Sequence, residues 1–371
     1  MSRSIVVVGA GVFGAALARR CTQRGWDVTL VERVTPGHVR AGSGGESRLI
    51  RCAHGADDWH ARLARRALTL WRELDPSLVV GAGVVWFARR ADAWEAASER
   101  TLTALGIPCE RVDPAALFPS VDTGDLAFAL FEPEAGILRA RDATRALADD
   151  AVAHGARFVH ATARPHGEAV MLHDGTLLEA DRVAWACGAW LPSLFPGMLR
   201  LRITQQDVFF FGATARWRTP GVPGWVDYDG AAYGLGDLDG RGVKVAPDVE
   251  GPQIDAETLE RAPRPEHQAL ARAYLRHRFP RLAGAPLVGT RTCQYELTPD
   301  TRFLLAPHPD HDGRVWLLGG GSGHGFKHGP ALAEVVERWI AGEEEPDPAF
   351  GLGERRGDMR LRTAGASAPP P

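Results

Sequence analysis

A glycine-rich turn between a strand and a helix is the feature that most limits what this chain can fold into. The β-branched run SIVVV at residues 4–8 predicts a buried strand, and residues 15–25 predict a helix that ends at Gly25. Three glycines with G-x-G-x-x-G spacing separate the two elements: Gly9, Gly11 and Gly14. The first permits a tight turn, the second lets the backbone approach a pyrophosphate, and the third lets the helix pack on the strand. Because the amino end of a helix attracts phosphate, the motif predicts a bound dinucleotide.

A second strand with an acid at its end extends this unit. Residues 27–31 (DVTLV) predict the strand, and Glu32 directly after it is placed to accept hydrogen bonds from ribose hydroxyls. The order strand, helix, strand implies a parallel sheet. The motif does not by itself distinguish NAD from FAD, and a glycine turn in an unrelated α/β fold is the alternative.

Two kinds of pattern alternate along the rest of the chain. Helices are predicted at residues 56–74, 92–105, 142–154, 265–278 and 329–341. Asp142 is the expected cap of the third helix. Aromatic, alternating residues from 203 to 248 favour antiparallel strands. The sequence therefore predicts an α/β fold, α+β overall, in which a Rossmann-like nucleotide-binding domain is interleaved with an antiparallel-sheet substrate domain.

The domain boundaries follow from where each pattern returns. We expect the nucleotide-binding domain to comprise residues 1–82, 140–200 and 291–345. The substrate domain is expected to comprise residues 83–139 and 201–290. The polar tail at residues 352–371, which ends in alanine and proline, is expected to be disordered.

Composition narrows the possible classes of function. The chain has 371 residues, a formal net charge of -3 and no apolar run of the ~18 to 20 residues that a membrane span needs. We therefore expect no nucleic-acid partner and no membrane partner. The five cysteines are scattered and lack C-x-x-C spacing, so we expect neither a disulfide framework nor a metal site. Since the start of the chain lacks the pattern of a signal peptide, we expect a cytoplasmic protein, and a monomer.

Two further segments place cations beside glycines. Arg48 and Arg51 lie in the segment SGGESRLIR, and Lys327 ends the turn GGGSGHGFK. A planar guanidinium suits a carboxylate, and a cation near a flavin stabilises its reduced anionic state. A glycine-rich turn from strand to helix lets backbone N–H groups approach a flavin edge or an anion. From these residues alone, an exposed basic loop and a surface turn with a solvated lysine remain the alternatives.

Together these segments resemble the sarcosine oxidase and N-methyltryptophan oxidase branch of the D-amino-acid oxidase (DAO) superfamily, whose members are FAD-dependent oxidases. The resemblance extends over roughly residues 4–345. Its most specific pieces are RTCQYELTPD at residues 291–300 and SGHGFK at residues 322–327. The resemblance implies an FAD-binding domain, a small-molecule substrate and O2 as the electron acceptor.

The resemblance also implies which residues hold the cofactor. Cys293 matches the cysteine that carries FAD through a thioether, although its own chemistry is equally that of a buried structural thiol. Arg48 matches an arginine packed near the flavin. The residues expected to contact FAD are Gly9, Gly11, Gly14, Glu32, Ser43, Ser47, Arg48, Gly188, Cys293, Gly321, Gly323, Gly325, Phe326 and Lys327.

The substrate side follows in the same way. Arg51 and Lys327 match the family's carboxylate-binding pair, and Lys244 matches a lysine proposed to activate oxygen. Tyr233 and Tyr295 match two active-site tyrosines. The expected catalytic residues are Arg48, Tyr233, Lys244, Asp248 and Tyr295.

Asp248 is a departure from the sarcosine oxidase pattern. Sarcosine oxidases have a histidine four residues after the lysine, where this chain has Asp248, and a histidine usual before the first arginine is replaced within the segment SGG at residues 43–45. An aspartate also occurs in the family member that oxidises piperideine-2-carboxylate in nikkomycin biosynthesis. A carboxylate at this position can anchor a substrate ammonium or take its proton, whereas a surface acid on a shifted loop is the alternative.

The sequence thus predicts an oxidase of a secondary amine or of an amino or imino acid, with an N-methyl or cyclic imino acid as the expected substrate. Hydride transfer to flavin N5 and reoxidation by O2 would give hydrogen peroxide. Four alternatives stay open: sarcosine oxidase proper, a flavin dehydrogenase that passes electrons to a carrier, an NAD(P)-dependent reductase, and a non-catalytic flavin-binding module.

Overall fold

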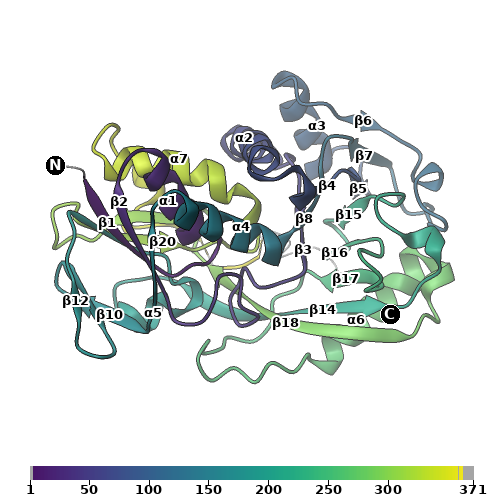
Figure 1. The fold of residues 1–371 in the computed structure, drawn as a ribbon. Helices are drawn as coiled ribbons and strands as arrows, with labels where there is room; N and C mark the ends of the chain where they lie inside the picture. The colour runs from purple at the N-terminus through teal and green to yellow at the C-terminus, as the bar shows by residue number, and fades with distance from the viewer. Residues whose placement is uncertain (1–2, 358, 362–371) are drawn as a thin grey trace.

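Two large β-sheets lie side by side and divide the molecule into two lobes (Figure 1). The computed structural model describes residues 3–357 and 359–361. One sheet has six strands, of which most are parallel, and the other has eight strands, of which most are antiparallel. The predicted fold class, α/β with a second sheet-based domain, is therefore confirmed.

The six-stranded sheet contains the strand that precedes the glycine motif. Its strands, in spatial order, are β19 (Leu304–Pro307), β20 (Val315–Gly319), β13 (Arg182–Trp185), β1 (Ser4–Val8), β2 (Asp27–Glu32) and β9 (Arg157–His160). Only β19 runs antiparallel to its neighbour. Because the central strands are covered on both faces, they are apolar and buried almost throughout.

Helices cover one face of this sheet, and a small sheet covers the other. The helices are α1 (Val12–Gln23), α2 (Asp58–Leu74), α4 (Ala140–Ala153) and α7 (Gly329–Ile340), which share one apolar core with the sheet. The small sheet consists of β10 (Ala163–His166), β11 (Ala169–Leu172) and β12 (Leu177–Leu178), and it packs with the opposite face. This is the layered arrangement expected of a parallel sheet.

The expected cap of α4 is wrong. The helix begins at Ala140 rather than at Asp142, because strand β8 (Gly136–Arg139) runs directly into it and Arg139 is the capping residue. The backbone N–H of Ala140 donates to the Glu46 carbonyl at 3.1 Å. Asp142 instead lies in the first helical turn, where an acid interacts favourably with the helix dipole.

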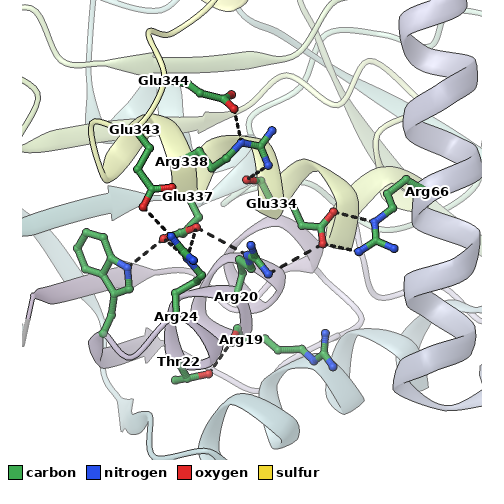
Figure 2. A network of polar contacts seen from close by, with 11 residues as sticks. Arg19, Arg20, Thr22, Arg24, Arg66, Glu334, Glu337, Arg338, Glu343 and Glu344 are labelled. Atoms are coloured by element: carbon green, nitrogen blue, oxygen red, sulfur yellow. Dashed lines mark hydrogen bonds and ion pairs between the residues drawn. The ribbon is translucent and has the colours of Figure 1, made fainter.

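A charged network fixes α1 against α7 (Figure 2). Glu337 of α7 is almost fully buried and accepts a hydrogen bond from Trp26 Nε1 at 3.1 Å. Its carboxylate also pairs with Arg20 at 3.7 Å and with Arg24 at 3.3 Å. Arg66 of α2 joins the network through Glu334 at 2.7 Å. Because α1 and α7 each follow a glycine-rich turn, this network fixes the two turns relative to each other.

The eight-stranded sheet forms the second lobe. Its strands, in spatial order, are β18 (Leu287–Leu297), β14 (Arg202–Phe211), β17 (Val243–Pro247), β16 (Ala232–Leu235), β15 (Gly224–Asp227), β5 (Val84–Ala88), β7 (Phe128–Glu132) and β6 (Glu110–Arg111). The pair β5 and β15 is parallel, so the sheet is mixed rather than purely antiparallel. Strand β18 pairs with β14 along most of its length, and the boundary expected at residue 291 therefore falls inside one strand.

The remaining elements connect or cover the two sheets. Helix α6 (Pro265–Arg278) packs on the eight-stranded sheet through an aromatic core that includes Tyr274 and Phe279. Strands β3 (Ser47–Ile50), β8 and β4 (Val79–Val80) form a third small sheet. Helix α3 (Trp94–Ala104) contacts α2, and α5 (Leu191–Leu194) follows the turn after β13.

The beginning of the tail differs from the expectation of disorder. Arg355 pairs with Asp300 and donates to the Phe303 carbonyl at 3.2 Å, because β19 and the turn before it offer acceptors there. The expected disorder of residues 358 and 362–371 concerns positions outside the described residues. Within the described ranges, no helix combines the length and the apolar character needed to cross a membrane.

Candidate active site

A cavity of about 470 Å³ lies where the parallel strands end. The residues that directly follow β1, β2, β9 and β13 all line it, as does Gly319 at the end of β20, and β18 contributes residues from the other sheet. Ligands of open α/β sheets bind at the carboxyl ends of the strands, and the volume falls within the roughly 300 to 1,000 Å³ typical of small-molecule sites. The topology therefore marks this cavity as the candidate site.

Backbone alone forms the wall next to β1. Gly9 has a φ of 98°, and a Cβ atom there would lie 2.6 Å from the Ala186 carbonyl oxygen. A Cβ atom on Gly14 would overlap the carbonyl of Gly9, so α1 can approach the turn only without a side chain. A Cβ on Gly11 would lie 3.4 Å from Ser43 Oγ. The three glycines thus form a close cradle of the kind that receives a pyrophosphate.

Glu32 and Ser43 complete the nucleotide end of the cavity. The Glu32 carboxylate accepts hydrogen bonds from the backbone N–H groups of Ala10 at 2.8 Å and Val34 at 3.0 Å. Ser43 Oγ accepts from the Val12 N–H at the start of α1, at 2.9 Å. An acid fixed beside the glycine turn suits a ribose, and the donors at the helix end suit phosphate. These residues fit the adenosine diphosphate half of FAD.

Arg48 of β3 lines the cavity, and Cys293 of β18 lies next to it. Arg48 donates to the carbonyls of Ser47 at 2.8 Å and Gly42 at 2.7 Å, and its Nη2 lies 3.8 Å from Cys293 Sγ. The guanidinium also stacks 5.7 Å from the Phe326 ring centroid. The structure therefore places a thiol, a fixed cation and an aromatic ring next to one another, from three separate segments.

Lys244 approaches the same group from β17. Its Nζ donates to the Ser47 carbonyl at 3.1 Å and to Ser47 Oγ at 3.3 Å, and it is almost fully buried. Burial, together with the nearby charge of Arg48, lowers the pKa of Lys244 to about 7. A small change in its surroundings can therefore change its charge near neutral pH.

Two tyrosines and Asp248 lie next to this group. The hydroxyls of Tyr233 and Tyr295 are 3.3 Å apart, and Lys244 Nζ lies 5.6 Å from the Tyr233 ring centroid. Burial raises the pKa of Tyr233 to about 12, and the negative charge of Asp248 contributes to the rise. Burial, with contributions from Tyr233 and Asp248, also raises the pKa of Tyr295. The charge of Asp248 therefore acts on both tyrosines.

Arg51 and Lys327 are each fixed by a backbone carbonyl. Arg51 donates to the Ala53 carbonyl at 2.8 Å and stacks 4.5 Å from the Trp86 ring centroid. Lys327 is buried, and its Nζ donates to the His324 carbonyl at 3.2 Å. Burial raises the pKa of the Cys52 thiol, and the charges of Lys327 and Arg51 both oppose that rise. The positive charges of Arg51 and Lys327 therefore both act on the Cys52 thiol.

The second glycine-rich turn passes close to the tyrosines. A Cβ atom on Gly323 would lie 2.7 Å from the Tyr295 ring, and one on Gly325 would lie 2.9 Å from the Phe13 ring. Gly321, Gly323, Gly325 and Phe326 all line the cavity. Gly188, which has a φ of 54°, lines it from the turn after β13. The two glycine-rich turns and the turn at Gly188 thus face one cavity.

The sequence analysis gave no role to Glu296, which also lines the cavity. Its carboxyl accepts a hydrogen bond from the Gly320 N–H at 3.1 Å, and burial raises its pKa to about 7. A Cβ atom on Gly188 would lie only 2.9 Å from Glu296 Oε1, so the acid sits against that turn. The signal that predicts this residue is an acid inside the strand that carries Cys293.

A segment of the second lobe also reaches the nucleotide end of the cavity. Glu257 accepts from Trp190 Nε1 at 2.7 Å and pairs with Arg33 at 2.9 Å. Arg33 stacks 4.6 Å from the Trp190 ring centroid. No signal in the sequence predicts this contact, because residues 33, 190 and 257 lie on three distant segments without a motif.

Comparisons with known proteins agree with this geometry. The family profile described as FAD dependent oxidoreductase (DAO) matches residues 4–339. The chain is 30% identical over 354 residues to a monomeric sarcosine oxidase of Streptomyces avermitilis. The alignment covers 90% of this chain and 92% of the relative. The chain is also 27% identical over 372 residues to an N-methyl-L-tryptophan oxidase of Salmonella heidelberg. That alignment covers 95% of this chain and 97% of that relative.

Solved structures share the fold at lower identity. An L-proline dehydrogenase from P. horikoshii superposes with a TM-score of 0.83 at 19% identity, over 95% of this chain and 97% of that chain. At this identity the likeness concerns the arrangement of the two lobes.

Proposed function

Because this chain belongs to the DAO family of FAD-dependent oxidoreductases, we propose that it oxidises the carbon–nitrogen bond of a secondary amine or of an amino or imino acid. The proposed substrate is an N-methyl or cyclic imino acid, the acceptor is O2, and Cys293 holds FAD covalently. The names of its relatives, which are oxidases of sarcosine and of N-methyl-L-tryptophan, support this substrate class.

A single arrangement carries the proposal. Arg48 lines the cavity away from the glycine cradle, and Cys293 and Lys244 lie directly beside Arg48 and Ser47. Arg48 Nη2 lies 3.8 Å from Cys293 Sγ, and both Arg48 and Lys244 bond to Ser47. The cradle fits the nucleotide half of FAD, and Cys293 and Arg48 would hold its isoalloxazine half. A cation at that place favours the reduced, anionic form of a flavin.

Two groups supply the positioning that the reaction needs. Arg51 and Lys327 are proposed to bind the substrate carboxylate, since a guanidinium and an ammonium pair with it by charge-assisted hydrogen bonds. Holding the substrate in one pose removes much of the entropic barrier to reaction. Trp86 and the Ala53 carbonyl hold Arg51 in place before substrate arrives.

The amine must lose its proton before the carbon–nitrogen bond is oxidised. Asp248 is proposed to take that proton or to anchor the ammonium, because its charge already acts on both Tyr233 and Tyr295. FAD, when bound, supplies the acceptor for the hydride and passes the electrons to O2, which yields hydrogen peroxide. Lys244 is proposed to place a positive charge where oxygen becomes reduced.

The attachment at Cys293 is tested by precipitating the purified protein with acid. We expect the yellow colour to stay in the pellet and the Cys293 peptide to carry the mass of FAD. Cys293→Ser should release the flavin into the supernatant, whereas the matched control Cys109→Ser, a half-buried thiol packed near α3, should not. Free flavin from the unaltered protein, with an unmodified Cys293 peptide, would contradict the attachment.

The substrate class is tested by bleaching of the flavin. The panel contains sarcosine, N-methyl amino acids, proline, pipecolate and piperideine-2-carboxylate, and hydrogen peroxide is assayed in parallel with dye reduction under nitrogen. Clear preference for sarcosine would contradict the role given to Asp248. Dye reduction without peroxide would make the protein a dehydrogenase.

We also propose that the protein is a monomer and lies in the cytoplasm. Light scattering tests the oligomeric state, and cell fractionation tests the location.

A further inference from the structure

Four histidines from separate segments meet in the core behind the proposed substrate site. His54 follows β3, His60 lies in the first turn of α2, and His324 and His328 lie on either side of Lys327. All four are buried. The rings of His54 and His328 have centroids 5.3 Å apart, and those of His54 and His324 are 5.9 Å apart. No sequence spacing announced this cluster.

Three of these histidines bring ring nitrogen atoms close together. One ring nitrogen each of His54, His324 and His328 lies within 4.8 Å of the others. A zinc ion bound at about 2.0 to 2.1 Å by tetrahedral imidazoles needs nitrogen atoms roughly 3.4 Å apart, so the nitrogen atoms must move closer by up to about 1.4 Å to bind one ion. The imidazoles belong to a ligand class that suits zinc, copper, iron and nickel.

Neighbouring acceptors orient these rings as they are oriented in metal sites. His54 Nδ1 lies 2.9 Å from the Cys52 carbonyl oxygen, and His324 Nε2 lies 2.9 Å from the Thr301 carbonyl oxygen. A carbonyl can only accept, so in each neutral ring this nitrogen carries the proton and the opposite nitrogen carries the lone pair. Metal-binding histidines usually donate their second ring nitrogen to a carbonyl or carboxylate in this way.

The fourth histidine brings a carboxylate to the cluster. His60 stacks on His54 with ring centroids 5.3 Å apart, and its Nδ1 lies 2.7 Å from Asp57 Oδ2. A negative charge beside a set of neutral imidazoles offsets part of the charge of a divalent cation. The Asp57 carboxylate therefore favours a cation at this site.

We propose that His54, His324 and His328 form a binding site for a divalent transition-metal ion of the zinc class. The site is buried, and its three protein ligands leave a fourth coordination position for a further ligand such as water. It adjoins the proposed carboxylate pair, because Arg51 donates to the Ala53 carbonyl and Lys327 donates to the His324 carbonyl. An ion there would fix the two backbone segments that hold these cations. The site itself does not depend on the proposed function.

Zinc binding to the full-length, flavin-loaded protein tests the proposal. The protein is treated with a chelator, dialysed against ZnCl2 and then against buffer, and zinc is measured per chain. We expect stoichiometric zinc and a Tm that is a few degrees higher than that of the chelated protein, because an ion that binds only the folded state stabilises it. Substoichiometric zinc would overturn the proposal.

Variants locate the ion. His328→Phe keeps an aromatic ring beside Phe303, and His54→Gln keeps a polar side chain beside the Cys52 carbonyl; both should lose the zinc and the rise in Tm. The control His311→Phe alters a histidine pair elsewhere, whose ring centroids are 4.4 Å apart, and should bind zinc like the unaltered protein. The flavin-to-protein ratio reports folding of each variant. Zinc retained by His328→Phe and His54→Gln alike would place the ion elsewhere and overturn the proposal.

Discussion

The two ends of the cavity use different parts of the polypeptide. At the nucleotide end, the glycines of one turn shape the wall, and the contacts are mostly backbone N–H groups close together in the sequence. At the other end, side chains of Arg48, Lys244 and Cys293 meet from β3, β17 and β18. Closely packed glycine backbone therefore shapes the nucleotide end, whereas buried charged side chains shape the other end.

This difference teaches where each kind of substitution should act. A change at the nucleotide end alters the space that a dinucleotide can occupy, so it should remove the cofactor altogether. A change at the charged end leaves the space intact and alters one step of the reaction. Each substitution below tests that division.

Gly14→Val should have the largest effect. A Cβ at this position overlaps the Gly9 carbonyl, which is backbone and cannot move away cheaply. We expect a protein without flavin, or no folded protein at all, as measured by the ratio of visible to protein absorbance. The control Gly284→Ala adds a Cβ that meets nothing within 4 Å and should load flavin normally. A yellow, active Gly14→Val protein would contradict the claim that a change at the nucleotide end removes the cofactor.

Lys244→Met should slow the reaction with oxygen and leave flavin loading unchanged. Loss of one preorganised charge near a developing anion costs about 10²- to 10³-fold in rate. Stopped-flow reoxidation of the reduced protein measures this step separately from substrate oxidation. Equal slowing of both half-reactions would show that Lys244 serves folding or substrate binding instead.

The same lysine predicts a pH dependence. Burial and Arg48 lower its pKa to about 7, so its positive charge is present below that pH and is lost as pH rises through it. The reoxidation rate of the unaltered protein should therefore fall as pH rises through about 7, and Lys244→Met should lose this transition. A transition that persists in the variant would belong to another group.

Arg51→Met should weaken the use of substrates that carry a carboxylate. Loss of one partner of a desolvated charge pair costs a few kcal/mol, so we expect kcat/KM to fall about 100-fold. The matched comparison is an amine of the same shape without the carboxylate, on which the variant and the unaltered protein should act equally. An equal fall in kcat/KM on both amines would show that Arg51 does not bind the substrate carboxylate.

Sequence reasoning reached the nucleotide end more fully than the charged end for a physical reason. The turn at Gly9 depends on neighbours within one βαβ unit, so its geometry follows from local spacing. By contrast, the convergence of Arg48, Lys244 and Cys293 depends on which strands pair, and only the family resemblance suggested it. Strand β18 was not predicted, because its first half, LVGTRT, has neither an apolar run nor a hydrophobic alternation.

Residues with no local signal were missed altogether. The histidine cluster and the contact between Glu257 and Trp190 each join distant segments without a motif. Glu296 lies inside a recognised segment, but its burial depends on the turns at Gly188 and Gly320 that close over it. Tertiary packing, rather than residue type, makes these side chains distinctive.

Glu296→Gln should have the smallest effect, and the sign of its effect on the free energy of unfolding is informative. Burial raises the folded-state pKa of Glu296 from 4.5 to about 7. Below 4.5 the carboxyl is protonated in both folded and unfolded chains, so it adds no pH-dependent term. Between pH 4.5 and pH 7 the carboxyl loses its proton in the unfolded chain but keeps it in the folded chain, so the free energy of unfolding falls as the pH rises. Above pH 7 this loss of stability has reached its full size. Removing the charge should therefore raise the free energy of unfolding by about 1 to 3 kcal/mol at pH 8 and by less at pH 5.

Denaturant unfolding of the flavin-loaded protein at both pH values measures this difference. Glu257→Gln is the control of opposite sign at the same cavity, because hydrogen bonds from Arg33 and Trp190 lower the pKa of Glu257. Its removal should cost stability above the normal pKa and cost less as the pH falls. If Glu296→Gln instead destabilises the protein more at pH 8 than at pH 5, the carboxylate is ionised and paired in the folded state. The charged end of the cavity would then extend along β18 toward the nucleotide.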